Sequence, residues 1–152
     1  MSFDAAATMN AVKAHLTDAS PELFFAVEIA RPVTPVGEGP TASIHVESMS
    51  VVETTLVRAI ELHLLKVRVY QAAHTQALET RETEAARIVS EVMDLLYEDF
   101  TLGGRVRNVD VAGQYGTPLG ATFGPDEIGE AEYHVADITL PIIVDSATDF
   151  VA

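Results

Sequence analysis

The chain has 152 residues and no cysteine, and its 23 acidic and 9 basic residues give a formal net charge of −14. This length fits one domain with its own core, and the lack of cysteine excludes a disulfide framework, a thiolate metal site and a cysteine nucleophile. So negative a protein repels the phosphate backbone, which argues against ordinary nucleic-acid binding.

The chain opens with a helix and a strand. Residues 4–18 place apolar side chains along one helical stripe, and Ser2 or Asp4 is positioned to cap the helix start. Residues 24–30 carry the alternation of apolar and other residues that is typical of a strand.

A long loop and two further strands follow. Three prolines and two glycines between residues 31 and 40 predict a loop, and a loop of this length is a candidate functional segment. Residues 42–47 alternate as a half-buried strand. Residues 56–70 also alternate, but the phase slips by one residue at Leu64 and Leu65, which predicts a long strand bent by a β-bulge.

Residues 80–99 have the strongest helical pattern, with apolar residues at spacings of three and four. Gly103 and Gly104 provide the stop. Glu98 and Asp99 lie at the helix end, where they oppose the helix dipole, so we expect these acids to serve something other than helix stability.

The last part of the chain predicts two strands around a second long loop. Residues 106–111 form one strand, residues 112–130 the glycine-rich loop, and residues 133–144 the last strand. Pro141 cannot donate to a strand ladder, so this strand is expected to be an edge strand or to be bulged there.

This order of elements predicts a single α+β domain over residues 1–152. We expect a largely antiparallel mixed sheet of about five strands with two main helices packed on one face, and long loops at 31–40 and 112–130. No internal repeat is present, and no apolar run reaches the length of a membrane span. The start of the chain lacks the pattern of a signal peptide, so the protein is expected to be soluble and not exported.

A search for catalytic motifs finds no phosphate loop, dinucleotide fingerprint, nucleophile elbow or His-Glu-x-x-His zinc motif. His45 and His63 are predicted to face outward, where they form either a metal pair or two polar residues on a solvated sheet face. The acidic pairs Glu98–Asp99 and Asp126–Glu127 are weak candidates, because adjacent acids arise by chance in so acidic a chain. We therefore expect no enzyme activity, no metal and no cofactor.

The charge is uneven along the chain, because no lysine or arginine follows Arg107 whereas acids continue to Asp149. Two interpretations stay open: a solvated surface that keeps the protein soluble, or a surface that must not hold DNA passing close by. Arg105, Arg107 and Asp110 form either a surface charge network or an ordinary solvated strand.

Two stretches carry a resemblance to a known family. The first is FTLGGRVRNVDVAGQYGTPL at residues 100–119, followed by Gly120-Ala121, and the second is YHVADITLPIIV at residues 133–144. With LKVRVY at residues 65–70 and the MSFD start, they resemble tail terminator proteins of long-tailed siphovirus phages that infect actinobacteria. The sequence departs from the family pattern at Phe123-Gly124, where Gly-Tyr is expected, and residues 31–40 have no counterpart.

The resemblance implies a structural protein without catalysis. Such a subunit forms a homohexameric ring that caps the head-proximal end of the tail tube, stops tube polymerisation and provides the surface for head and neck joining. The implied partners are the chain itself, the major tail tube protein and neck or connector proteins. DNA only passes through the lumen, no membrane is involved, and the location is the virion tail after assembly in the host cytoplasm.

The alternatives are a neck or connector protein and an acidic DNA-mimic inhibitor. Under the terminator reading, some surplus acids line the ring's hole, although the sequence does not say which. The candidate ring or tube contacts lie in the resemblance segment and the proline-rich loop, where the glycines serve either contact or plain turn geometry: Leu102, Gly103, Gly104, Arg105, Arg107, Asn108, Asp110, Tyr115, Pro118, Pro32 and Pro35.

Overall fold

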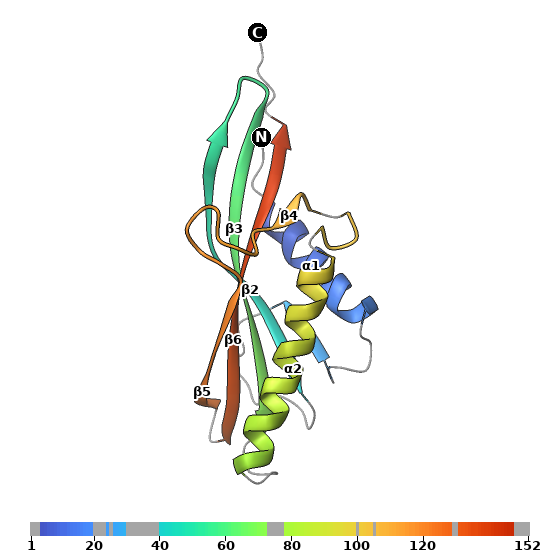
Figure 1. The fold of residues 1–152 in the computed structure, drawn as a ribbon, viewed down its shortest axis with the longest axis vertical. Coiled ribbons are helices and arrows are strands. Elements are labelled where there is room, and N and C mark those ends of the chain that lie inside the picture. The colour runs from blue at the N-terminus through green and yellow to red at the C-terminus, as the bar shows by residue number, and fades with distance from the viewer. Residues whose placement is uncertain are drawn as a thin grey trace.

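A computed structural model describes residues 4–19, 24, 26–29, 40–72, 78–99, 101–104, 106–128 and 131–147. Within these ranges the chain forms two helices and six strands (Figure 1). In chain order they are α1 (Ala5–Ala19), β1 (Ala26–Ile29), β2 (Thr41–Thr54), β3 (Arg58–Ala72), α2 (Leu78–Glu98), β4 (Asn108–Val109), β5 (Gly120–Ile128) and β6 (Ala131–Ala147).

The strands form one mixed sheet in the order β1-β2-β3-β6-β4, with β5 also paired to β6. The β1–β2 pair is parallel, and the other pairs are antiparallel. The predicted α+β class with a largely antiparallel sheet is therefore confirmed. The sheet has one strand more than expected, because β5 lies in a segment that we had predicted to be loop.

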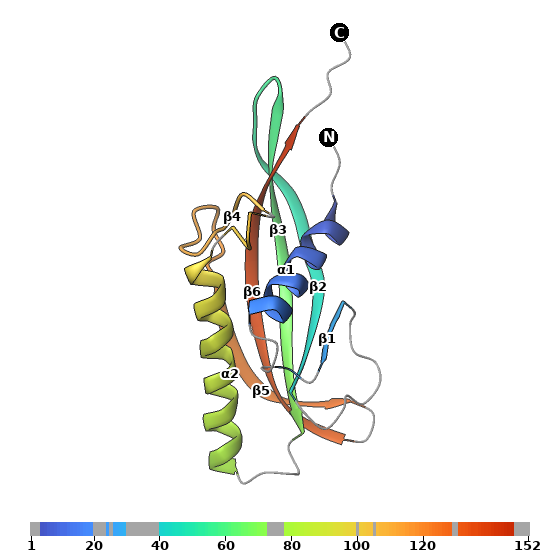
Figure 2. The ribbon, with the colours of Figure 1, turned by 90° about the vertical axis from the view of Figure 1, so that its right-hand side faces the viewer.

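Both helices cover the same face of the sheet, as predicted (Figure 2). Val12 and Leu16 of α1 and the apolar stripe of α2 pack against alternate residues of the central strands, and all of them are buried in one core. Its members on β3 and β6 are Leu65, Val67, Val69, Ala136, Ile138, Leu140 and Ile142. This side is called the helix face below. Neither helix within the described ranges combines the length and apolar content that a membrane span requires.

The start of α1 confirms the predicted cap at Asp4, whose Oδ1 accepts a hydrogen bond from the backbone N–H of Ala7 at 2.9 Å. At the end of α2, Asp99 has a local role. Its carboxylate accepts hydrogen bonds from the Gly103 N–H at 3.1 Å and the Thr101 hydroxyl at 3.0 Å. These bonds lower the pKa of the Asp99 carboxyl, the Gly103 bond most strongly. Asp99 thus stabilises the turn that follows the helix.

The predicted bulge in the strand at residues 56–70 is wrong. β3 pairs with β6 in continuous register from Arg58 to Ala72. The apparent slip in phase arises because the polar residues Glu61 and His63 occupy helix-face positions and are fully buried there. The register shifts lie on the neighbouring strand β2 instead, near Glu47 and Val52.

Pro141 lies in a central strand, so the prediction of an edge or a bulge is also wrong. On one side β6 bonds β3, and on the other it bonds β5 up to Thr139 and β4 from Ile142. Pro141 falls in the interval between those two partners, where its carbonyl accepts a hydrogen bond from the Asp110 N–H at 2.9 Å. A ladder donor is not needed at that position, and proline fits.

The second predicted loop is shorter than expected. It continues only to Leu119, because residues 120–128 form β5 along β6. The glycines and the proline of this segment resemble loop composition, but each residue from Gly120 to Ile128 has a pairing partner on β6. The strand predicted at 106–111 is reduced to the two residues of β4. Of the first predicted loop, only Pro40 is described.

The β2–β3 hairpin and the end of β6 project beyond the helices at one end of the molecule (Figure 1). We call this projection the arm and define it as residues 48–60 together with residues 144–147. Its strands continue directly from the body of the sheet, since β3 and β6 remain paired from Arg58 to Ala72. The arm is therefore a direct extension of the sheet.

Candidate functional site

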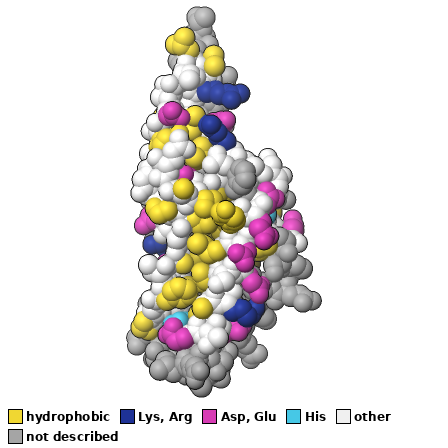
Figure 3. Space-filling model, viewed as in Figure 1, with side chains coloured by type: hydrophobic (Ala, Val, Ile, Leu, Met, Phe, Trp, Pro, Cys, Tyr) yellow, Lys and Arg dark blue, Asp and Glu magenta, His cyan; other side chains and the backbone are white. Residues whose placement is uncertain are grey.

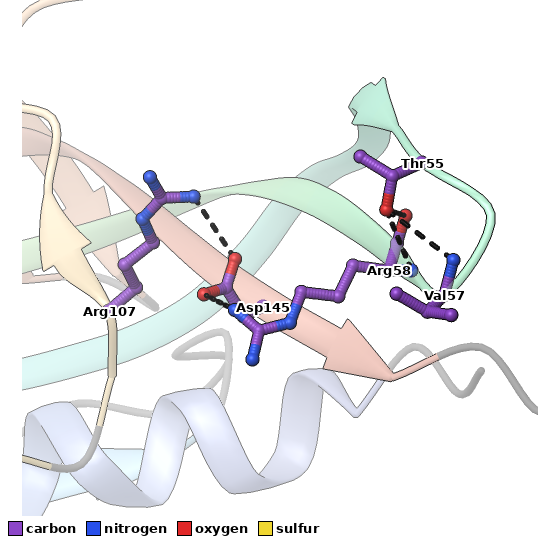
Figure 4. Close-up of polar contacts among 5 residues, drawn as sticks. All are labelled: Thr55, Val57, Arg58, Arg107 and Asp145. Atoms are coloured by element: carbon purple, nitrogen blue, oxygen red, sulfur yellow. Dashed lines mark hydrogen bonds and ion pairs between the residues drawn. The ribbon is translucent and has the colours of Figure 1, made fainter.

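The tip of the arm is a tight turn closed by Thr55. The Thr55 N–H donates to the Arg58 carbonyl at 2.7 Å, and the Arg58 N–H donates to the Thr55 hydroxyl oxygen at 3.1 Å (Figure 4). The two residues between them, Leu56 and Val57, are 84% and 66% exposed. Hydroxyl bonding of this kind accounts for the turn, but it gives no reason for two large apolar side chains in water.

Exposed apolar side chains concentrate on the arm and its base. Among the described residues, six large apolar side chains are exposed, and four of them belong to the β2–β3 hairpin: Met49, Val51, Leu56 and Val57. Figure 3 shows apolar side chains at this end of the molecule, with basic side chains just below them. Grouped exposed apolar residues with a polar rim are typical of a protein interaction site.

A pocket of about 450 Å³ lies on the arm, on the side of the sheet opposite the helix face, and is lined by Glu53, Thr54, Thr55, Arg58, Ile60, Arg107 and Asp145. Asp145 lies between two guanidinium groups, 3.1 Å from Arg107 and 3.7 Å from Arg58 (Figure 4). Two cations share one carboxylate, and both remain well exposed. The contact leaves cationic hydrogen-bond donors available to another acid.

The remaining acid of the pocket, Glu53, is engaged by the loop before β5. The Tyr115 hydroxyl donates to its Oε2 at 2.8 Å. This hydrogen bond to a carboxylate stabilises the neutral phenol and raises the pKa of Tyr115. The bond also ties the loop to the base of the arm, so the loop and the hairpin form one surface.

The side chain of Asp110 stabilises that loop through hydrogen bonds to its backbone. Its side chain is buried, and its two carboxylate oxygens accept hydrogen bonds from the N–H groups of Gln114, at 2.8 Å, and Tyr115, at 3.1 Å. Gly113 has a φ of +74°, and an added Cβ there would lie 2.7 Å from the nitrogen of Pro118. Close backbone approach therefore requires glycine at this position.

The structure separates the candidate contact residues into two groups. Arg107 lines the arm pocket, and Tyr115 bonds Glu53, another residue that lines it. Leu102 is fully buried in the core, which removes it as a surface contact and corrects that prediction. Asp110 is likewise buried and bonds its own loop, so the surface network with Arg107 does not form.

The other candidates have simpler positions. Gly103 and Gly104 are exposed with positive φ, and they serve the turn after α2. Asn108 lies in β4, where its side chain donates to the Val109 carbonyl, and Pro118 is exposed on the loop. Pro32, Pro35 and Arg105 fall outside the described residues.

His45 and His63 do not form a pair, because they project from opposite faces of the sheet. His63 lies on the helix face beneath α1, where its Nδ1 is 2.9 Å from the Thr8 hydroxyl and its Nε2 is 2.9 Å from Glu61 Oε1. The prediction that His63 faces solvent is therefore wrong. Within the described part of the chain, no group of three or more potential ligands is placed to hold a metal ion.

Sequence reasoning missed Glu53, Arg58 and Asp145 as site residues. Arg58 and Asp145 are 87 positions apart, and only the register that places Asp145 opposite Ile60 brings them together. The tip has no Gly, Pro, Asn or Asp, so the usual signal of a hairpin turn is absent. For this reason the sequence predicts Leu56 and Val57 to lie in a strand.

The fold and the arm define a small α+β protein that carries an exposed apolar tip beside a pocket rich in arginine. No family model matches the chain, and no curated protein matches it. Solved structures do resemble it: one, whose name states no function, has 17% identity and a TM-score of 0.47, over 97% of this chain and 95% of the other. A second is a sheath/tube terminator of an extracellular contractile injection system in its extended state, with 12% identity and a TM-score of 0.47 over 97% of this chain. This chain covers 60% of that subunit's length.

Proposed function

We propose that this protein is a tail terminator: a subunit that assembles into a homohexameric ring on the head-proximal end of a phage tail tube, ends tube growth and presents a surface for head and neck joining. The observation that carries the proposal is the arm. Its tip places Leu56 and Val57 in water although the turn depends only on Thr55 and backbone bonds. A protein that works by assembly has a use for such a surface.

The placement of the resemblance segments supports this function. The two stretches at 100–121 and 133–144 are bonded to each other through the β4–β6 and β5–β6 ladders and the Asp110–Pro141 bond. The third, at 65–70, pairs with the second along β3 and β6. The residues that resemble tail terminators thus form one connected scaffold, and its loop supports the arm through Tyr115.

Charge adds a second line of support. A net charge of −14 disfavours retention of a passing polyanion, so acids that line a ring's hole would let DNA slide through. Measuring tail DNA ejection in phage whose terminator carries Asp-to-Asn and Glu-to-Gln changes at lumen positions tests this part by itself.

The central experiment mixes the purified protein with the polymerising tail tube protein of the same phage. We expect tubes to stop growing and electron micrographs to show a ring at one end of each tube. Loss of the gene should give tails of uncontrolled length that fail to join heads. Tubes that elongate unchanged and bind no protein would contradict the proposal.

A parallel binding measurement separates the alternatives. A neck or connector protein binds the portal side and ignores the bare tube. A DNA-mimic inhibitor binds a DNA-processing enzyme and competes with duplex DNA. The terminator binds the tube end first and gains affinity for the neck only after the ring has formed.

A further inference from the structure

This inference rests on the proposed ring and names its subunit contact. We propose that the arm of one copy docks on the exposed C-terminal half of α2 in the next copy, so that Leu56 and Val57 cover Tyr97 while Arg58 and Arg107 face Asp94 and Glu98.

The local balance of acidic and basic side chains favours the arm as one side of the contact. Two copies of a chain with a charge of −14 repel each other, so contact is favoured where acids do not outnumber bases, as in the arm pocket, whose two acids are balanced by two arginines. Arg68 and Arg87 are matched by acids of their own: Arg68 bonds Asp137 through two hydrogen bonds, and Arg87 bonds both Glu84 and Glu91. At the arm, by contrast, Arg58 and Arg107 share the single carboxylate of Asp145.

The C-terminal half of α2 has the complementary properties. Tyr97 is 66% exposed, and the acids Asp94, three residues before it, and Glu98, one residue after it, are also exposed. Neither acid has a cation partner among the described residues. Figure 3 shows acidic side chains gathered over this half of the helix. An exposed aromatic ring with two exposed carboxylates on the same helix fits an apolar tip beside two arginines.

The other exposed aromatic residue, Phe123, is a weaker match. It lies on β5 beside a pocket lined by Arg68 and Asp137, whose charges already neutralise each other. That pocket offers Arg58 and Arg107 no described carboxylate that lacks a cation of its own. The charge balance therefore favours Tyr97.

The geometry permits repetition. The arm pocket and the C-terminal half of α2 are separate patches of one subunit. The pocket is built on the arm, whereas α2 packs over the helix face of the body of the sheet (Figure 2). Contacts between two different patches are heterologous, and they close into a ring when the rotation between copies allows it.

The cysteine-free chain makes a direct test possible. Val57→Cys and Tyr97→Cys variants, one carrying a mass tag, are mixed and mildly oxidised, alone and on tail tubes. We expect the mixed disulfide to exceed either homodimer, and a Val57→Cys/Tyr97→Cys double variant to give multimers up to a closed ring. Val57→Cys mixed with Ala6→Cys, at an exposed position on α1, is the matched control.

A charge reversal tests the electrostatic part. Arg58→Glu should slow the Val57–Tyr97 cross-link by roughly ten-fold at low salt, and Glu98→Lys in the other variant should restore much of the rate. Arg58 has a side chain that is 64% exposed, so this change leaves the fold intact, which circular dichroism checks.

The outcomes distinguish the contact from the function. Rings that cap tubes but give no Val57–Tyr97 cross-link above the Ala6 control overturn the contact and leave the terminator proposal standing. A Val57 homodimer that exceeds the mixed species also overturns it, because the contact is then between identical patches. Failure to bind tubes at all contradicts the proposed function itself.

Discussion

Nε2 of His63 lies 2.9 Å from Oε1 of Glu61, and both side chains are fully buried on the helix face of β3. The other ring nitrogen, Nδ1, is 2.9 Å from the Thr8 hydroxyl. A buried polar group is costly unless it is hydrogen-bonded, so these three side chains stabilise one another as a unit. The unit joins the first turns of α1 to the strand that continues into the arm.

We predict that Glu61→Ala costs about 3 kcal/mol or more of unfolding free energy, because it leaves His63 buried with an unsatisfied nitrogen. The double variant Glu61→Leu/His63→Leu should be less destabilised than the sum of the single changes, since it removes both polar groups. Urea denaturation of the three variants measures the coupling. Strictly additive single effects below about 1 kcal/mol would show that the network is not a unit.

Gly113→Ala should destabilise the protein by about 1–3 kcal/mol, because the new Cβ meets the backbone nitrogen of Pro118 at 2.7 Å and φ is positive. Gly116→Ala is the matched control: its φ is also positive, at +106°, but a Cβ there meets nothing within 4 Å. Thermal unfolding should rank Gly113→Ala as clearly the more harmful. Equal losses would mean that backbone conformation, and not the close approach, decides the cost.

The Tyr115–Glu53 bond predicts a titration. The pKa of Tyr115 is raised by its bond to Glu53, so the contribution of this bond is present below the ordinary tyrosine pKa and is lost as the pH rises through the higher value. Glu53→Gln should lower the pKa of Tyr115, because the tyrosinate then no longer meets the negative charge of Glu53. NMR of labelled tyrosine, with Tyr115→Phe to assign the signal, measures this, and an unchanged midpoint would argue against the bond in solution.

The contribution of Asp99 to stability should depend on pH in the opposite direction. The bonds from Gly103 and Thr101 lower its pKa, so its contribution is present above the ordinary value of 3.8 and is lost as the pH falls through the lowered one. Asp99→Asn should therefore lower the urea midpoint at pH 7, and the difference from the unchanged protein should shrink near pH 2. A difference that stays constant across this range would rule out the carboxylate as its source.

The elements with strong local patterns could be predicted from the sequence. The two helices follow from their apolar stripes and the cap at Asp4, and Leu78–Glu98 matches the predicted 80–99 closely. The strand at 133–144 was also found, because β-branched residues alternate there. In these segments the local preference and the final packing agree.

The predictions that were wrong or missing concern features that depend on contacts between residues far apart in the sequence. Glu61 and His63 contradict the hydrophobic pattern of β3, and their burial is compensated by contacts such as their mutual bond and the contact of His63 with Thr8 on α1. β5 was read as a loop because Gly120, Gly124 and Pro125 favour turns, and pairing with β6 overrides that preference. The arm pocket required the β3–β6 register, which no local pattern contains.

The unbroken pairing of β3 and β6 has a mechanical consequence. Because the ladder from Arg58 to Ala72 has no register shift, a pull on the arm tip along the strands loads many hydrogen bonds at once in shear, and they must fail together. A hinged arm would yield at one joint. A neighbour that grips Leu56 and Val57 therefore transmits force straight into the body of the sheet.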